Sequence, residues 1–440
     1  MLAGAQVPAA APPAIVSADT AWMLMSTALV LLMTPACGFF YGGLVRAKNA
    51  LNTMMMCLGS LAVVGVTWAL VGYTLSFNGT NRWIGGLGNL FLNDVGLEAR
   101  GTIPHLLFMS YQGTFAVVTA VLIAGAVVER MRFGAYLAFI GVWSLVIYAP
   151  LAHWVWGGGW LGQLGVLDFA GGTVVHINAG VAATVAAVLV GQRKDFGRQA
   201  VLPHNVPFVL LGSILLYFGW FGFNAGSALA ANGAAALAFT NTMLAPMAAL
   251  AVWMALDSLR TQRATAVGAA TALVVGLVVI TPAAGFVSPL SALAIGALGA
   301  MPSYFGILWR SRTRLDDSLD VLAGHGVGGV SGALLTGVFA DARWGGTNGL
   351  LFGHPGQLAL QAVGVLATIV YSAVGTFVVL KAVGLLFPLR ATTRAEGVGM
   401  DITQHGEEAY AEGEGAVLVF RDASAPQHIA QPLTAKVGTA

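Results

Sequence analysis

Two histidines lie within long apolar stretches of the sequence, and each follows an aspartate by eight residues. Asp168 precedes His176, and Asp317 precedes His325. Ionisable side chains at membrane depth are costly and usually mark an ion or proton pathway. A neutral imidazole offers one hydrogen-bond donor and one acceptor, so two of them could pass a small polar molecule or a proton along an apolar passage. We expect His176 and His325 to serve such a pathway; a core histidine bonded to a neighbouring helix is the alternative.

The aspartates also have a simpler interpretation. Asp168 stands directly before an apolar segment, where a carboxylate can cap a helix by accepting backbone N–H groups. A carboxylate fixed in this way would still shape the entrance to the pathway. Asp316, Asp317 and Asp320 follow arginines at positions 310, 312 and 314, so we expect some of these aspartates to belong to a solvated ion-pair cluster.

Aromatic residues form a second candidate site. Trp156 precedes three glycines, Tyr111 and Phe115 open an apolar segment, and Phe223 and Ser227 close another. Aromatic faces can hold a small cation with roughly 0.5–2 kcal/mol each, and a hydroxyl can accept a hydrogen bond from it. The alternative is the aromatic belt of membrane surfaces, which is expected to account for most of the 11 tryptophans.

The composition places these residues in a membrane. Of the 440 residues, 57% are hydrophobic and only 9% are charged, and the mean hydropathy is +0.80. Soluble proteins carry roughly 25% charged residues. The net charge of +2 gives no reason to expect a nucleic-acid partner. Cys37 and Cys57 both lie in apolar stretches, and we expect small core residues there and not a disulfide.

A helix needs about 20 apolar residues to cross the hydrocarbon core. The sequence predicts eleven such spans, at residues 21–42, 52–77, 112–128, 133–153, 173–191, 207–228, 236–257, 265–283, 286–309, 321–340 and 358–388. Fifteen lysines and arginines follow or close the odd-numbered spans, and three follow the even-numbered spans. Cytoplasmic loops are enriched in these residues. We therefore predict an all-α membrane protein with its N-terminus outside and its C-terminus in the cytoplasm.

The two Asp–His pairs stand at equivalent places, at the start of spans five and ten. If spans one to five and six to ten are repeats, their odd number of helices gives them opposite orientations, and span eleven is a final long helix. Asp168 then lies near the outer surface and Asp317 near the inner surface. The two histidines would approach the middle of the membrane from opposite sides.

We expect three parts along the chain. Residues 1–18 form an extracytoplasmic N-terminal segment, which is rich in alanine and proline and lacks the pattern of a signal peptide. Residues 19–390 form the membrane domain. Residues 391–440 form a polar, acidic cytoplasmic tail that is too short for an enzymatic domain.

Several strings resemble the hallmark segments of the ammonium transporter (Amt/Mep/Rh) family. They are G-F-F-Y-G-G-L-V-R-A-K-N from Gly38, V-W-G-G-G from Val155, D-F-A-G-G-T-V-V-H-I-N-A-G from Asp168, W-F-G-F-N-A-G-S from Trp220 and H-G-V-G-G from His325. The similarity runs in order from about residue 19 to residue 410. The resemblance implies two inverted five-helix repeats and a homotrimer with a pore in each subunit. Trp156 favours the Amt branch.

At matching positions the resemblance implies roles near the outer mouth. The outer recruitment site for ammonium would be formed by Trp156, Phe115, Tyr111 and Ser227. Phe115 and Phe223 would form a stacked gate below it. Position 111 is often phenylalanine in the family, so Tyr111 adds a hydroxyl near the mouth.

The resemblance also implies a function. NH4+ would be recruited outside and deprotonated, and NH3 would pass an apolar pore lined by His176 and His325, with Asp168 as a supporting carboxylate. Methylammonium would be an analogue, the membrane would be the inner (plasma) membrane, and no enzymatic activity, cofactor or metal is expected. The segment from Gly399 to Tyr410 is similar to the part of the family's tail where PII-type regulatory proteins dock.

Two alternatives to transport stay open at this point. The chain could be an ammonium sensor that signals through its cytoplasmic tail. It could also be a membrane redox protein in which His176 and His325 are axial haem ligands.

Overall fold

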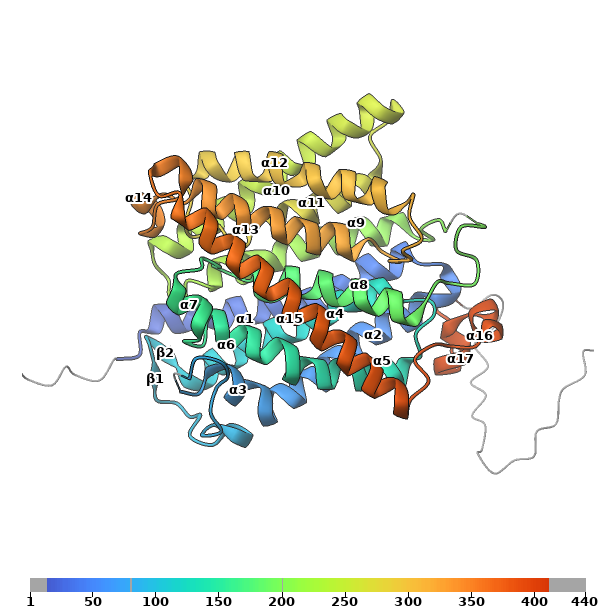
Figure 1. The fold of residues 1–440 in the computed structure, drawn as a ribbon, viewed down its shortest axis with the longest axis horizontal. Helices are drawn as coiled ribbons and strands as arrows, with labels where there is room; N and C mark the ends of the chain where they lie inside the picture. The colour runs from blue at the N-terminus through green and yellow to red at the C-terminus, as the bar shows by residue number, and fades with distance from the viewer. Residues whose placement is uncertain (1–13, 80, 200, 411–440) are drawn as a thin grey trace, which may run out of the picture.

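The computed structural model describes residues 14–79, 81–199 and 201–410. Figure 1 shows a bundle of long helices that run roughly along one direction, with α1 starting at one end and α16 and α17 at the other. The expectations for residues 1–13 and 411–440 lie outside the described residues. In the labels, η marks turns of 3-10 or π helix.

The first half of the chain contains five long helical stretches. They are α1 (Ser17–Leu44), α2, η2 and α3 (Ala50–Thr67, Trp68–Gly72 and Tyr73–Phe77), α4 (His105–Val127), α5, η4 and α6 (Phe133–Trp143, Ser144–Tyr148 and Ala149–Val155), and η5 and α8 (Gly172–Ile177 and Asn178–Val190). Shorter elements connect them: η1 (Ala47–Asn49), η3 (Leu90–Leu92), β1 (Ala99–Arg100), β2 (Ile103–Pro104) and α7 (Trp160–Leu164).

The second half, as far as the structure describes it, contains six. They are α9 and η6 (Val206–Trp220 and Phe221–Ala225), α10 (Gly233–Thr261), α11 (Ala266–Ile280), α12 (Pro289–Arg310), η7 and α13 (Leu322–Val327 and Gly328–Phe339), and α15 (Gly356–Leu386). Two short elements, α14 (Ala342–Gly345) and η8 (Leu350–Phe352), precede α15. The chain then turns into α16 (Thr393–Val398) and α17 (Met400–His405).

Ten helical segments of the described residues are long and apolar enough to cross a membrane. Each overlaps one of the predicted spans. The remaining predicted span, 265–283, corresponds to α11, which is apolar but has only 15 residues and ends at Ile280. The count of eleven, the two inverted repeats and the sidedness therefore stay predictions.

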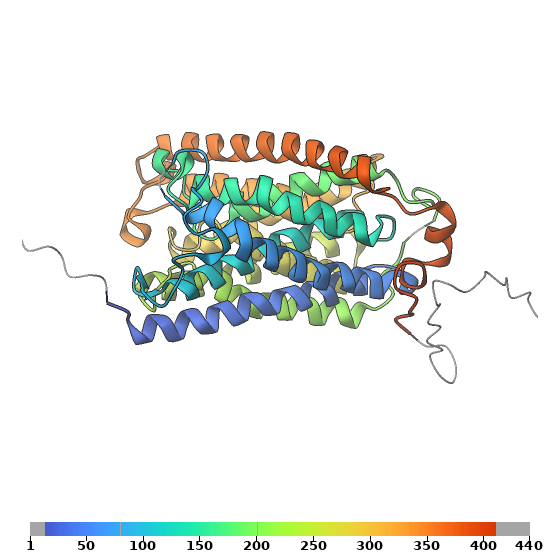
Figure 2. The same ribbon diagram turned by 90° about the horizontal axis from the view of Figure 1, so that it is seen from below.

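The helices differ in how far they are buried. Almost every residue of α4 from Tyr111 to Val127 is buried, so this helix lies in the middle of the bundle. The long helix α15 lies along one face of the bundle, opposite α1 (Figure 2), and its Leu366, Val370 and Val374 are each about 60% exposed. An outer helix with an apolar exposed face is what a lipid environment favours.

The two ends of the bundle carry different residues. We call the end with Trp156 and the β1–β2 hairpin the aromatic end, and the end with Arg193 and α16–α17 the charged end. At the charged end the tail packs on the start of α2, where Asp401 accepts the backbone N–H groups of Leu51 and Asn52 at 3.0 and 2.7 Å. The described part of the tail is thus fixed to the membrane helices.

Candidate functional site

The structure brings the two histidines together in the middle of the bundle. Nδ1 of His325 lies 3.3 Å from Nδ1 of His176, and the rings are nearly parallel, with centroids 5.3 Å apart. Both side chains are buried, and Nε2 of His176 has no hydrogen-bond partner among the described residues. One Nδ1 must donate and the other accept. The pair therefore has an internal hydrogen bond and an unused polar atom.

A very small apolar pocket surrounds the pair. Its volume is about 10 Å³, and His176, His325, Trp220 and Phe223 are among its lining residues. A cavity of roughly 10–15 Å³ holds a single water-sized molecule. The indole of Trp220 stacks on His176 with centroids 5.4 Å apart. A guest at this point must be the size of water and must shed its hydration shell.

Glycine allows the two histidine-bearing segments to meet. A Cβ atom on Gly180, one turn after His176, would lie 2.3 Å from the backbone nitrogen of Gly326, next to His325. Real Cβ atoms essentially never approach a backbone atom so closely, so a side chain there would push η7 away from α8. The close backbone contact sets the distance between the imidazoles.

Asp168 acts as a cap at the aromatic end of η5. Its carboxylate accepts the N–H groups of Gly171, Gly172 and Thr173 at 2.8, 2.6 and 2.8 Å, and also the Thr173 hydroxyl. Gly171 has φ +115°, a value that favours glycine. The carboxylate thus fixes the segment that leads to His176. The carbonyl of Asp168 also accepts the indole N–H of Trp156 at 2.9 Å, which holds that ring in place.

A cavity of about 320 Å³ lies at the aromatic end. Its lining residues are Phe77, Phe108, Gln112, Phe115, Val155, Trp156, Phe169, Ser227 and Leu229. Three of the four residues expected at a recruitment site, Trp156, Phe115 and Ser227, line it. Tyr111 does not: it is buried beneath the cavity, and its hydroxyl donates to the carbonyls of Gly222 and Phe223, each at 3.0 Å.

Sequence reasoning missed several cavity residues. Phe108 and Gln112 precede Phe115 by seven and three residues, so all three lie on one face of α4. That spacing could have identified the two additional residues. Phe77 and Phe169 come from the end of α3 and the segment before η5, and no periodic signal points to them.

Two stacked rings close the passage below this cavity. Phe115 and Phe223 lie with centroids 4.2 Å apart and planes at 21°. Phe115 lines the cavity at the aromatic end, whereas Phe223 lines the histidine pocket. The rings therefore separate the two spaces, and one of them must move for a guest to pass.

A larger cavity of about 530 Å³ lies on the other side of the histidines. His325 lines both this cavity and the histidine pocket, and Arg193, Arg310 and Asp320 line its wall toward the charged end. The spaces thus form a series from the aromatic end to the charged end: the cavity with Trp156, the stacked rings of Phe115 and Phe223, the histidine pocket, and the larger cavity with Arg193.

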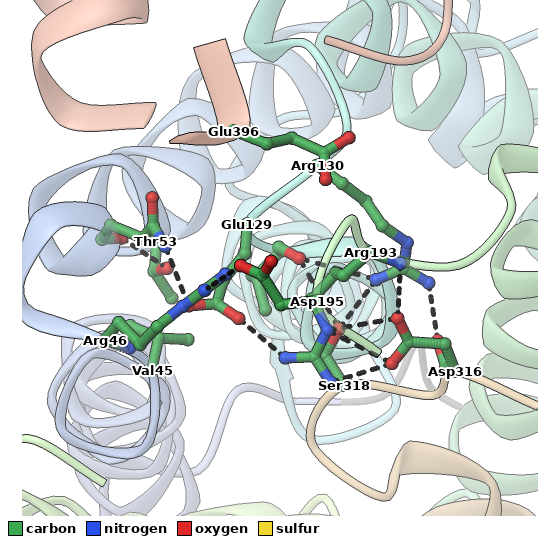
Figure 3. A network of polar contacts seen from close by, with 12 residues as sticks. Val45, Arg46, Thr53, Glu129, Arg130, Arg193, Asp195, Asp316, Ser318 and Glu396 are labelled. Atoms are coloured by element: carbon green, nitrogen blue, oxygen red, sulfur yellow. Dashed lines mark hydrogen bonds and ion pairs between the residues drawn. The ribbon is translucent and has the colours of Figure 1, made fainter. Parts of the chain in front are cut away.

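Buried charges hold the charged end together (Figure 3). Glu129, which is completely buried, pairs with Arg46 at 2.8 Å and Arg193 at 2.6 Å, and Arg193 pairs with Asp316 at 2.7 Å. Burial alone would raise the pKa of Glu129, but Arg193 and Arg46 outweigh it and hold this pKa below its usual value. The same balance of burial and Arg193 lowers the pKa of Asp316.

These contacts correct the expectation of a solvated aspartate cluster. Asp316 and Asp317 are buried, and Asp316 pairs with Arg193 across the bundle and not with the arginines that precede it. Only Asp320 follows the expectation, through its ion pair with Arg310. Asp316 does not pair with the arginines that precede it in the sequence, because Arg193 in the connection between α8 and α9 lies beside it at the charged end.

Axial haem ligation does not fit the geometry. The histidine rings are in direct hydrogen-bond contact, and the pocket around them holds about 10 Å³. A macrocycle between the rings has no space. In residues 14–79, 81–199 and 201–410, no group of three or more His, Cys, Asp and Glu side chains is arranged to hold a metal ion.

Fold and site together define the class of this protein. A helical membrane protein in which cavities at both ends are joined by a narrow apolar passage is a channel or transporter for a small molecule. The chain matches the model of the Ammonium Transporter Family over residues 21–410, and it belongs to that family. The resemblance found in the motifs is thereby confirmed.

Individual relatives agree with this assignment. The ammonium transporter of Bacillus subtilis (strain 168) is 47% identical over 398 residues, which cover 89% of this chain and 98% of the relative. The ammonium transporter Amt1 of Archaeoglobus fulgidus is 42% identical over 393 residues, covering 89% and 99%. Mep2 from Candida albicans, for which a crystal structure is solved, is 36% identical to this chain in sequence. The two structures superpose with a TM-score of 0.82, over 86% of this chain and 87% of the Mep2 chain.

Proposed function

We propose that this chain carries ammonium across the plasma membrane by letting neutral ammonia pass the histidine pair. The observation that carries the proposal is the water-sized apolar pocket around His176 and His325. An ammonia molecule fits such a space and can hydrogen-bond to the unpartnered Nε2 of His176. The family membership and the ammonium transporters among the relatives support ammonium as the substrate.

Recruitment takes place in the cavity at the aromatic end, which we assign to the outer surface. The faces of Trp156 and Phe115 attract NH4+, and the hydroxyl of Ser227 accepts one of its hydrogen bonds. Tyr111 contributes from below, because its hydroxyl lies 3.3 Å from the Ser227 hydroxyl and 3.0 Å from the Phe223 carbonyl. It orients the receiving residues and does not itself contact the cation.

Deprotonation lowers the free-energy cost of crossing the apolar pocket. Moving a bare ion through an apolar pocket costs several kcal/mol or more, because no charge or water compensates the lost hydration. NH4+ can lose its proton and cross as NH3 when Phe115 and Phe223 separate. K+ has no proton to lose, so the same pocket excludes it.

Two routes are available to the released proton. It can return to the outer solution, so that transport is electroneutral, or it can pass along the hydrogen bond between His176 and His325, so that each ammonia is accompanied by a charge. The current that follows an ammonium jump on a solid-supported membrane distinguishes the routes. A sustained, saturable current supports relay through the histidines; substrate uptake without current supports return to the outside.

An ammonium sensor is the second candidate. A solved structure titled "Sensor Amt Protein" is 30% identical to this chain, with a TM-score of 0.82, and 98% of that chain is covered. Methylammonium uptake into proteoliposomes separates the two functions. A transporter accumulates the analogue at a rate that saturates, whereas a pure sensor shows no uptake above that of protein-free liposomes.

The assembly and the tail complete the proposal. We infer a homotrimer in which the membrane domain, residues 19–390, contains one pore per chain, and a cytoplasmic tail from residue 391 that can receive a PII-type protein. The fixed position of α17 on the start of α2 supports a surface that a partner could recognise. Light scattering of the purified protein in detergent measures the number of chains, and co-elution with a PII-type protein tests the partner.

A further inference from the structure

A positive charge stands behind the wall of the outer cavity. The guanidinium of Arg100 stacks on the ring of Phe108 at 4.4 Å from its centroid, and it lies 5.8 Å from that of Phe77. Both rings line the cavity, but Arg100 does not. These two rings could attract a cation in the cavity, but both already face the guanidinium of Arg100.

The β1–β2 hairpin and the start of α4 hold Arg100 in this position. Its Nη2 donates to the carbonyl of Phe77 at 3.1 Å, and its Nη1 donates to the Tyr73 hydroxyl at 2.9 Å and to Nε2 of His105 at 3.0 Å. A guanidinium can only donate, so Nε2 of His105 is an acceptor and the ring proton is on Nδ1. That proton points to Glu98, whose Oε1 lies 2.8 Å away.

The charge of Arg100 has no carboxylate to balance it directly. In the described part of the chain no carboxylate forms an ion pair with Arg100, and the nearest acidic group of this cluster, Glu98, bonds to His105 instead. Two consequences follow for a cation in the cavity. It is repelled by Arg100, and it gains less from Phe108 and Phe77, since a ring already facing one cation attracts a second one less.

We propose that Arg100 is an affinity-determining residue of the outer site, which lowers the affinity for cations and restricts their binding to the side of the cavity with Trp156 and Phe115. His105 is a positioning residue that keeps Arg100 on the rings. The inference rests on the proposed function, since it requires NH4+ to enter this cavity. The charge of Arg100 opposes tight binding, so that the site releases its cation and does not trap it.

The test is a titration of methylammonium uptake in proteoliposomes of the full chain, a readout that both proton routes give. In Arg100→Gln we expect KM to fall about fivefold at low ionic strength, with the maximal rate within about twofold, and the difference to shrink at roughly 1 M salt, where the Debye length is about 3 Å. Arg100→Lys keeps the charge and should leave KM within about twofold of the wild type. An unchanged or higher KM in Arg100→Gln would overturn the proposal.

His105→Leu and His105→Gln test the positioning role of His105. Leucine cannot accept from Nη1 of Arg100, so KM should fall toward that of Arg100→Gln; the amide oxygen of glutamine can accept and should keep KM within about twofold of the wild type. A wild-type KM in His105→Leu would refute this role, and this variant decides the matter if Arg100→Gln fails to fold. A wild type with neither methylammonium uptake nor ammonium current contradicts the proposed function itself; normal wild-type uptake with no shift of KM in Arg100→Gln contradicts only this inference.

Discussion

Tyr111 shows how a side chain outside the cavity can act on the residues that line it. Its hydroxyl lies 3.0 Å from the carbonyl of Phe223 and 3.3 Å from the hydroxyl of Ser227. Ser227 itself donates to the Phe223 carbonyl at 2.8 Å. Both hydroxyls thus donate to the same carbonyl, and the tyrosine acts on Ser227 by competing with it for that acceptor.

Removing this hydroxyl should strengthen recruitment. In Tyr111→Phe the carbonyl of Phe223 accepts from Ser227 without this competitor, and a hydroxyl that donates more strongly is a better acceptor for NH4+. We expect KM for methylammonium uptake to fall by up to about threefold and the free energy of unfolding to decrease by about 1 kcal/mol, the net contribution of one hydrogen bond. Uptake kinetics and thermal unfolding in detergent measure both. A rise in KM would show that Tyr111 contacts the cation directly.

At the residue scale, spacing and the family resemblance pointed to most of the residues that the structure brings together at the histidine pocket and the cavity beside it. The equal distances from Asp168 to His176 and from Asp317 to His325 selected the two imidazoles that the structure brings together. The orientation of Tyr111 was not predictable, because whether a side chain at the mouth points into or below a cavity depends on packing against η6, a segment over 100 residues away.

The segments η5 with α8 and η7 with α13 position the site. Arg193 follows α8 and pairs with Asp316, which precedes η7, so the end of one segment lies beside the start of the other. The two segments therefore run in opposite directions and approach each other most closely at Gly180 and Gly326. Glycines surround both histidines in the sequence, but the particular contact between these two backbones required the structure.

A side chain at this contact should separate the histidines. In Gly180→Ala the new Cβ would lie 2.3 Å from the nitrogen of Gly326, and the backbone must move. We expect methylammonium uptake to fall at least tenfold, because a displacement of about 1 Å of reacting groups can have an effect of this size or more. Proteoliposome uptake at equal protein content measures it.

Gly65→Ala is the matched control for this variant. Gly65 lies within α2, and apart from its own stretch of helix no described atom lies within 4 Å of the position its Cβ would take. Since alanine favours a helix over glycine by about 1 kcal/mol, this variant should be as stable as the wild type or slightly more so, with unchanged uptake. Comparable loss of uptake in both variants would contradict the assigned role of the contact.

For the whole molecule, composition and the distribution of lysine and arginine predicted an all-helical membrane protein, and the structure has ten helices of sufficient length among the described residues. The ion pairs at the charged end were not predictable. Glu129 and Arg193 are 64 residues apart, and only the packing of the bundle places them 2.6 Å from each other.

This network should make the stability sensitive to acid. The pKa of Glu129 and that of Asp316 lie below their usual values, so both carboxylates stabilise the folded state fully above about pH 4 and lose this contribution as the pH falls through the lowered values. We expect the thermal unfolding temperature in detergent to drop from pH 7 to pH 3. Glu129→Gln should lower it at pH 7, since breaking a buried ion pair costs about 3–5 kcal/mol, and should reduce the further drop in acid.

The exposed Glu407 offers a control of the same type. It makes no ion pair in the described part of the chain, so Glu407→Gln should unfold like the wild type at both pH values. If Glu129→Gln also matched the wild type at pH 7, the buried pair with Arg193 would not contribute as inferred.

In the proposed mechanism, the pair of His176 and His325 is the selective part of the pore. Uptake of methylammonium and of K+ into proteoliposomes tests it directly, with the wild type compared with the double variant His176→Ala/His325→Ala. We expect the wild type to take up methylammonium and to exclude K+, and the double variant to lose this selective transport. Methylammonium uptake and an exclusion of K+ that are both unchanged in the double variant would contradict it.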